Sequence, residues 1–366
     1  MSRFFMHTPG RGLMGAALAA ILAVAQPGWA EGISFAGQQI ESVTPSGTGG
    51  SGDAYLRFFE PWYGKYLPGE PTVLVRNMPG GGAMIGTNWF ATKAANDGSV
   101  YFVFSIGSMF KYLLESEDPV IQYDPMAWTA FIASPMGRVT YVHPSTGITS
   151  VEDLRDFDGT LTMAIQAVTG SDLPTMMALE LLGPEVKAIV GLDGGEKSLA
   201  YQRGELNVNT DITSAFLTNG ADLVASGEAI PLFSFGYENE EGEIVRDPNF
   251  PDIPSWPEAY EIVHGKKPDG PAYEAWLSMF RISVMASKAL VLPKDTPQEV
   301  IDAYWQASER IVADPAFAAR AEAAIGAYPQ TFGAVADERR RASLKLSEDA
   351  KSFIKAWVRE NLNVDL

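Results

Sequence analysis

Residues 45–53 read Pro-Ser-Gly-Thr-Gly-Gly-Ser-Gly-Asp, a glycine-rich loop between an alternating segment (40–44) and an amphipathic one (53–66). This is the order strand, loop, helix. The same order follows again, with expected strands at 73–76 and 100–105, a glycine loop at 77–82 and a helix at 83–95. Strands this apolar, separated by helices, indicate a parallel sheet covered on both faces. We therefore predict an α/β fold.

The rest of the chain continues this alternation. We expect further strands at 139–143, 160–165, 188–190, 206–211 and 230–235, and helices at 151–157, 173–182, 197–204, 297–313, 315–326 and 337–361. Residues 237–274 are rich in Pro, Gly and acidic residues, which predicts a surface excursion of loops and turns, and 280–292 is an apolar strand region. A chain of 366 residues is longer than one hydrophobic core usually serves, so we expect two domains.

The N-terminus has the pattern of a secretory signal peptide. Arg3 and Arg11 precede an apolar run at 13–25, which is too short to span a bilayer, and small residues follow up to Ala30. We predict a signal peptide at 1–30 and a periplasmic mature protein. The chain has no cysteine, which excludes a thiolate metal site. Its net charge of −18 disfavours binding to nucleic acid or anionic membranes. We expect a monomer.

Residues suited to catalysis or cofactor binding are few. His143 and His264 both lie in surroundings typical of turns, and no G-x-S-x-G nucleophile motif is present. Gly47–Gly52 matches the dinucleotide motif G-x-G-x-x-G, but Arg76 and Asn77 stand where a ribose-binding acid is expected, and exported proteins rarely meet soluble nicotinamide cofactors. We therefore predict no catalytic residues, no metal and no cofactor.

A glycine loop that opens a helix can instead bind an anion. Backbone N–H groups at a helix start, together with the helix dipole, favour a carboxylate. The hydroxyls of Ser46, Thr48 and Ser51 add donors, and 169–171 offers a matching set from the second half of the chain. Neutral donors make an Arg or Lys contact unnecessary, so we expect little salt dependence; Arg138 and Arg281 are the candidates if binding does depend on salt. The alternative is ordinary turn and cap chemistry, which applies most strongly to Asp53.

Five segments, in order, resemble the periplasmic solute-binding proteins of tripartite tricarboxylate transporters, the TctC-like or Bug family. The family's V-P-x-x-x-G-G-x-x-D is similar to residues 43–53, with one residue inserted before the proline, and its N-R-P-G-A-G-G-x-I-G-T and P-D-G-Y are similar to 77–87 and 96–101. Its Y-D-P matches 123–125, its L-P-D-V-P-T resembles 250–255, and its P-x-x-T-P turn resembles 293–297. The resemblance covers nearly the whole chain after residue 30.

The resemblance implies a type II periplasmic-binding-protein-like fold with a ligand cleft between two domains that close by a hinge motion. The implied domains are 31–135 plus 281–366, and 136–280 with the excursion at 237–274. The implied ligand-binding residues are Ser46, Thr48, Gly49, Gly50, Ser51, Asp53, Ser105, Ser108, Thr169, Gly170, Ser171, Asp172 and Asp211.

The implied function is a receptor that delivers a small carboxylate to the membrane permease subunits of a tripartite tricarboxylate transporter. The ligand class stays open between a linear di- or tricarboxylate and an aromatic carboxylate. Trp62, Trp89, Phe110 and Tyr112 are candidates for an aromatic wall, although their helical spacing is more typical of a core. Two other functions fit the same residues: a sensor that presents its ligand to a membrane histidine kinase, and an exported hydrolase.

Overall fold

Strands and helices alternate along the chain, as the sequence predicts. The computed structural model describes residues 32–192 and 194–366, so the predicted signal peptide lies outside the described residues. The strands are β1 (Gln39–Thr44), β2 (Thr72–Asn77), β3 (Val100–Val103), β4 (Thr129–Ser134), β5 (Arg138–Val142), β6 (Thr160–Ile165), β7 (Glu185–Val190), β8 (Val208–Ile212), β9 (Ile230–Ser234), β10 (Tyr237–Glu238), β11 (Ile244–Val245), β12 (Lys288–Leu292) and β13 (Thr331–Phe332).

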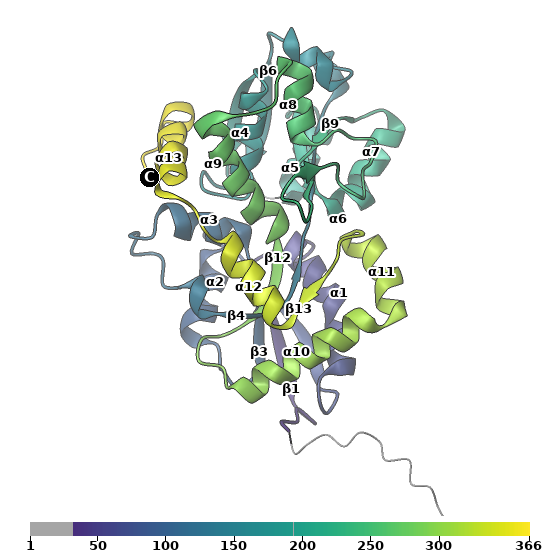
Figure 1. Cartoon of the computed structure of the whole chain (residues 1–366), viewed down its shortest axis with the longest axis vertical. Coiled ribbons are helices and arrows are strands. Elements are labelled where there is room, and N and C mark those ends of the chain that lie inside the picture. Colours follow the sequence, from purple (N-terminus) through teal and green to yellow (C-terminus); the bar gives the residue numbers. More distant parts are fainter. Residues whose placement is uncertain (1–31, 193) are drawn as a thin grey trace, which may run out of the picture. The chain divides into compact units, whose positions relative to one another are not determined.

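Helices cover these strands (Figure 1). They are α1 (Ser51–Tyr66), α2 (Met84–Lys93), α3 (Ile106–Leu114), α4 (Leu173–Leu181), α5 (Gly194–Gln202), α6 (Thr213–Ala215), α7 (Ala221–Ser226), α8 (Trp256–His264), α9 (Gly270–Phe280), α10 (Gln298–Ala313), α11 (Pro315–Ile325), α12 (Gly333–Ser343) and α13 (Glu348–Leu362). Among the described residues, no helix combines the length and apolar character that a membrane crossing requires.

The largest sheet has six strands in the order β13-β4-β12-β3-β1-β2. β1 is parallel to both β2 and β3, as predicted, but β12 is antiparallel to β3 and β4, and β13 is antiparallel to β4. The predicted parallel sheet is therefore confirmed for β1, β2 and β3, and the three other strands of the sheet add antiparallel pairings that the sequence did not predict. β12 comes back from a distant part of the chain and enters between β3 and β4 in the opposite direction, which local strand–helix alternation does not reveal.

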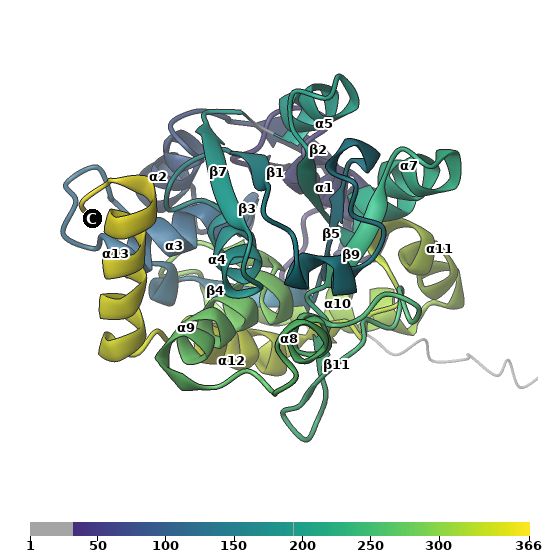
Figure 2. The same cartoon turned by 90° about the horizontal axis from the view of Figure 1, so that it is seen from above.

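A second group of strands lies between residues 138 and 234. β5 pairs with β8 on one side and β9 on the other, both antiparallel, while β6 and β7 form a separate parallel pair. Figure 2 shows β5 and β9 side by side. The second half of the chain therefore continues the alternation of strands and helices but does not repeat the sheet architecture of the first half.

The predicted surface excursion at 237–274 contains two helices, α8 and α9. Trp256 and Trp276 are fully buried, with ring centroids 4.0 Å apart, and the Trp256 indole N–H donates to the Ala178 carbonyl at 2.9 Å. Ser255 and Glu258 form a capping box that starts α8. The prediction of loops and turns is wrong for these helices. The composition of the segment is dominated by Pro, Gly and acidic residues, so the few aromatic residues that α8 and α9 bury did not indicate helices.

The C-terminal part also differs from the prediction in one element. The expected helix at 337–361 is divided into α12 and α13, and α13 packs against α9 and α3.

The apolar region 280–292 is a strand only from Lys288, because Arg281–Met285 continues α9 as a π-helical turn. Residues 33–366 form one compact unit, and the boundaries of two domains within it stay a prediction.

Candidate functional site

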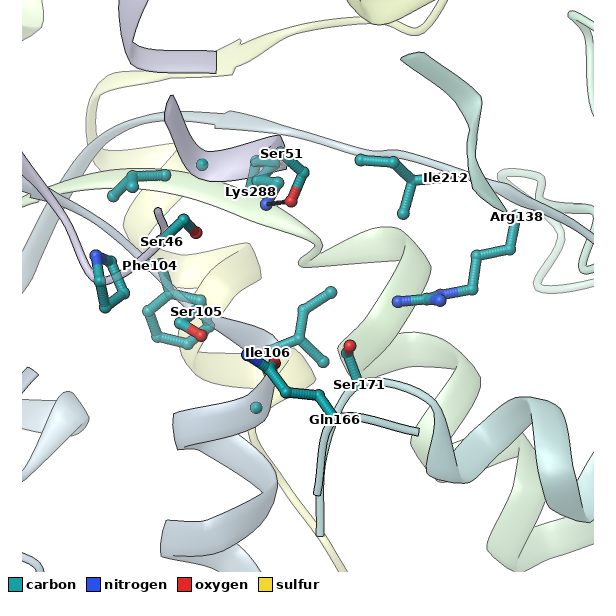
Figure 3. Close-up of a pocket in the computed structure, with 14 residues that line it drawn as sticks. Ser46, Ser51, Phe104, Ser105, Ile106, Arg138, Gln166, Ser171, Ile212 and Lys288 are labelled. Carbon is teal, nitrogen blue, oxygen red and sulfur yellow. Dashed lines mark hydrogen bonds between the residues drawn. The ribbon is translucent and has the colours of Figure 1, made fainter. Parts of the chain in front are cut away.

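A cavity of about 90 Å³ lies where several strands end and helices begin (Figure 3). β1 and β3 are parallel neighbours, so their carboxyl ends meet at one edge of the sheet, the usual place for a ligand in such folds. Antiparallel β12 starts at that same edge, and β5 and β8 pair through Arg138 and Ile212. The cavity is lined by Pro45, Ser46, Ser51, Gly52, Val103, Phe104, Ser105, Ile106, Gly107, Arg138, Gln166, Ser171, Ile212 and Lys288.

The glycine loop before α1 is held from behind by Asp53. Its buried carboxylate accepts hydrogen bonds from the Gly49 backbone N–H at 2.9 Å, from Asn77 at 3.0 Å and from Arg57 at 3.0 Å. Burial alone raises the pKa of Asp53, but these hydrogen bonds outweigh it, so the pKa lies below its ordinary value. Asp53 does not line the cavity; it fixes the loop that does.

Asn77 ties the end of β2 to this loop. Its side-chain amide donates to the Ser46 carbonyl and to the Asp53 carboxylate, both at 3.0 Å. We expect Asn77→Ala to lower the free energy of unfolding by roughly 1–3 kcal/mol, because a buried carboxylate loses a donor. Urea denaturation measures this loss. Asn96→Ala is the matched control, since Asn96 is exposed and donates only to the Asp295 carbonyl, and an equal loss in both variants would contradict the proposed role of Asn77.

Two helices direct their N-termini at the cavity. Ser51 and Gly52 open α1, and Ser105 caps α3 without a side-chain hydrogen bond to it. The first N–H groups of a helix lack partners within the helix and carry a partial positive charge, which favours an anion. A Cβ at Gly52 would lie 2.7 Å from the Ser46 hydroxyl, so only glycine lets this turn pack against the loop.

Two buried cations also line the cavity. Arg138 is 4% exposed and Lys288 is 6% exposed, and no ion pair joins either of them to another described residue. Lys288 Nζ lies 3.0 Å from Ser51 Oγ, and Arg138 Nε has no hydrogen-bond partner among the described residues. Burial, followed by repulsion from Arg138, lowers the pKa of Lys288 to about 8. The charges of Asp172 and Asp211 partly stabilise the charged form of Arg138, but neither cation has a direct ion-pair partner in the part of the chain that the structure describes. A buried cation without such a partner is costly, so this arrangement favours a bound anion.

The acidic residues near Arg138 are turned to other partners. Asp172 accepts from Lys197 Nζ at 2.7 Å, and Asp211 accepts from the Tyr141 hydroxyl at 2.6 Å. Side chains alternate along a strand, so Asp211 lies on the opposite face of β8 from Ile212, which lines the cavity. Burial raises the pKa of Asp211; burial acts the same way on Asp172, but Lys197 and Arg138 hold that pKa below its ordinary value.

Four of the predicted site residues line the cavity: Ser46, Ser51, Ser105 and Ser171. The others do not line it and are Thr48, Gly49, Gly50, Asp53, Ser108, Thr169, Gly170, Asp172 and Asp211. The Ser108 hydroxyl donates to the Ser105 carbonyl and Thr169 donates to Glu115, so these two hydroxyls are engaged within the protein.

The sequence predicts that neutral donors suffice for the ligand, with Arg138 and Arg281 as the candidates otherwise; in the structure Arg138 and Lys288 both line the cavity. Arg281, the other suspected cation, is bound to Glu238 at 2.6 Å and does not line it. Sequence reasoning missed Lys288 completely. Its signal is a lysine that directly starts the apolar run Ala-Leu-Val-Leu, where every side chain is buried.

The candidate aromatic wall and the histidines lie away from the cavity. Trp62 and Phe110 are core residues, while the Trp89 ring is covered by the Arg76 guanidinium, 4.7 Å from its centroid. His143 bonds to the neighbouring Ser145 and His264 to the Leu181 carbonyl. None of these aromatic and imidazole rings contributes to the cavity lining.

Similar folds are found among solved structures. No family model and no curated protein matches the sequence. An R. palustris protein solved with adipate is 18% identical, with a TM-score of 0.65, over 89% of this chain and 98% of that one. The periplasmic binding protein BugD is 18% identical, with a TM-score of 0.59, over 89% of this chain and 95% of its own. MatC from Rhodopseudomonas palustris with bound malate is 16% identical, with a TM-score of 0.59, over 86% of this chain and 99% of its own.

These similarities extend over nearly all of the described residues and over almost the full length of each neighbour. The predicted fold class is confirmed: this chain has the α/β fold of periplasmic binding proteins.

Proposed function

We propose that this protein is a periplasmic solute-binding receptor that captures a small carboxylate and delivers it to the permease subunits of a tripartite tricarboxylate transporter. The observation that carries the proposal is the cavity at two helix N-termini, which is lined by the buried cations Arg138 and Lys288, neither of them in an ion pair with a described residue. Such a site favours an anion of small size.

Three further observations support this function. The N-terminal sequence has the pattern of a secretory signal peptide. Five segments in order resemble the TctC-like family. Two proteins of similar fold are described with carboxylates, adipate in one and malate in the other. A periplasmic location and a transporter partner follow from the proposed family.

A thermal-shift screen tests the proposal. The chain from residue 31 onward is heated with linear and aromatic mono-, di- and tricarboxylates, dinucleotides and amino acids. We expect the unfolding midpoint to rise with a few carboxylates only, because a ligand at 100 times its Kd adds roughly 2.7 kcal/mol to the stability of the folded state. A rise with dinucleotides, or none with any carboxylate, would contradict the proposal.

A hydrolase is the second candidate, because Ser51 Oγ lies 3.0 Å from Lys288 Nζ at the start of α1. Burial lowers the pKa of Lys288 to about 8, and a lysine of lowered pKa can act as general base for a serine nucleophile. Arg138 favours a binding protein over a hydrolase, since a second buried cation in the cavity stabilises a bound anion. Release of product from p-nitrophenyl acetate by the native protein, and not by Ser51→Ala, would favour the hydrolase.

A further inference from the structure

We propose that Tyr328 and Asp247 are positioning residues of the ligand cavity, which hold the strand ends at Arg138 and Ile212 in place. This inference rests on the proposed function and adds two residues that do not line the cavity themselves. They act on the ligand only through the chain segments that they bind.

Two paired strand ends form one wall of the cavity. Arg138 begins β5 and Ile212 ends β8, and the two residues are partners in the antiparallel pairing of these strands. Both line the cavity, and Figure 3 shows them on the same side of it. Their chain neighbours are joined by a hydrogen bond from the Thr213 N–H to the Gly137 carbonyl at 3.0 Å. The position of these neighbours therefore determines where the Arg138 and Ile212 side chains lie.

The Tyr328 hydroxyl binds both neighbours at once. It accepts from the Gly137 N–H at 3.0 Å, lies 2.5 Å from the Thr213 hydroxyl, and donates to the Asp247 carboxylate. Because a phenol has one hydrogen and gives it to Asp247, the Thr213 hydroxyl is the donor in its bond to Tyr328. All three hydrogen bonds are buried, so loss of the phenol oxygen leaves two buried donors without this partner.

Asp247 fixes the direction of the Tyr328 hydroxyl. It is fully buried, and its second oxygen accepts from the backbone N–H and the side-chain amide of Asn249, both at 2.9 Å. Asn249 in turn accepts from the Ala327 N–H at 2.7 Å, which joins the two segments a second time. A Cβ at Gly137 would overlap the Asp247 carboxylate and lie 2.7 Å from the Tyr328 oxygen, so this close approach requires glycine.

Tyr328 makes these bonds from the large sheet. Shortly after it the chain forms β13, which pairs with β4 in that sheet, whereas β5 and β8 belong to the second group of strands. The Tyr328 hydroxyl therefore links the sheet that carries Lys288 to the strands that carry Arg138. Since both cations line one cavity, we expect ligand affinity to depend on this link.

Tyr328→Phe removes only the hydroxyl and tests the inference. The chain from residue 31 onward is titrated with adipate, with malate and with any carboxylate that raises the midpoint in the thermal-shift screen. We expect affinity to fall roughly tenfold, the range of one buried hydrogen bond, and the urea midpoint to fall as well.

Tyr304→Phe is the matched control. The Tyr304 hydroxyl is also fully buried and donates to the Gly98 carbonyl at 2.7 Å, but neither residue adjoins a cavity-lining one in the chain. This variant should lower the urea midpoint and leave ligand affinity unchanged. An equal loss of affinity in both variants would contradict a specific role of Tyr328.

A second substitution separates position from charge. Tyr328→Phe leaves the buried Asp247 carboxylate without its phenol donor, and adding Asp247→Asn removes that charge. The double variant should regain stability but not affinity, because the Gly137 N–H still lacks the phenol oxygen. Recovery of both would make Tyr328 a residue of the fold alone. If Tyr328→Phe does not fold, Thr213→Val removes one donor of the same group and should also weaken binding.

Hydrogen exchange of the ligand-free protein separates this inference from the proposed function. Peptides that cover 137–142 and 212–217 should exchange faster in Tyr328→Phe than in the native protein, and at the native rate in Tyr304→Phe. Unchanged exchange, or unchanged affinity for a carboxylate that the native protein binds, overturns the positioning role and leaves the carboxylate receptor standing. If the native protein binds no carboxylate, the proposed function fails, and the exchange rates alone decide whether Tyr328 holds these strand ends.

Discussion

Replacement of Lys288 by methionine is expected to weaken carboxylate binding by roughly 100-fold and, at the same time, to make the ligand-free protein more stable. Lys288 is buried and has no acidic partner among the described residues. Burial lowers its pKa from the ordinary value of 10.5 to about 8, so keeping the charge at neutral pH costs the folded state about 3 kcal/mol. Methionine fills similar space without a charge, which removes that cost and also the contact with the ligand.

The size of the stability gain from Lys288→Met depends on pH. The folded state holds the proton less tightly than the unfolded chain, so the charge of Lys288 destabilises the protein fully below pH 8. That penalty declines as the pH rises from about 8 and is gone above the ordinary pKa. The gain from Lys288→Met should therefore be largest at pH 7 and small above pH 10.5.

Urea unfolding of the ligand-free proteins and isothermal titration with the carboxylate measure the two effects separately. The exposed control variant Arg203→Gln should change neither by a detectable amount. A loss of both stability and affinity in Lys288→Met would mean that Lys288 stabilises the fold through its bond to Ser51, and the functional assignment would fail. Opposite changes in the two quantities are typical of a residue retained for function.

The sequence predicts those parts of the fold that are local. β1, the glycine loop and α1 were expected at nearly their observed bounds, because an alternating strand, a glycine turn and an amphipathic helix are each encoded by adjacent residues. The apolar region 280–292 predicts a strand, but not its position in the sheet, because the neighbours of β12, β3 and β4, lie more than 150 residues earlier in the chain. Its direction is set by the path of the chain through the second group of strands, which local patterning does not contain.

In the candidate site, too, the residues with a local sequence pattern are predicted and those brought together by distant parts of the chain are not. Ser46, Ser51 and Ser171 are predicted because each lies in or next to a loop that opens a helix, whereas Ser105 is implied only by the family resemblance; all four line the cavity. Arg138 was named only as a suspect and Lys288 not at all, since both are first residues of buried strands. A cation at a strand start has no local signature of ligand binding. Only the convergence of β12 and β5 on one cavity gives these two side chains a common role.

Asp53, Asp172 and Asp211 are predicted site residues that do not line the cavity. Each is an acidic residue beside a cavity-lining segment, and each is held by another partner: Arg57, Lys197 and Tyr141, respectively. From sequence, an acid at a helix start or a strand end can either meet a ligand or fix the loop. In the folded chain, hydrogen bonds hold Asp53 against the glycine loop and Asp211 against the neighbouring strand β5.

Carboxylate affinity is expected to be constant below pH 8 and to fall as the pH rises above it, by about tenfold for each pH unit. The reason is that Lys288 must be protonated to hold the ligand. A nearby carboxylate favours the charged form, so the pKa of Lys288 is higher in the complex than in the free protein. Arg138, the other cation that faces the cavity, stays protonated throughout this range because the pKa of arginine is far higher. Between pH 7 and pH 9.5, affinity should fall roughly 30-fold.

Titrations at pH 7, 8, 9 and 9.5 measure this dependence, and repeating them at pH 9 in two buffers of different ionisation enthalpy shows whether binding takes up a proton. Lys288→Met should bind weakly at every pH, with no slope and no proton uptake, whereas Lys288→Arg should bind with no slope because its charge persists. An unchanged slope in Lys288→Met would assign the titration to another group and contradict the role of Lys288. A flat profile in the native protein would mean that neutral donors hold the carboxylate, as the glycine loop by itself suggests, and that the buried lysine takes no part in binding.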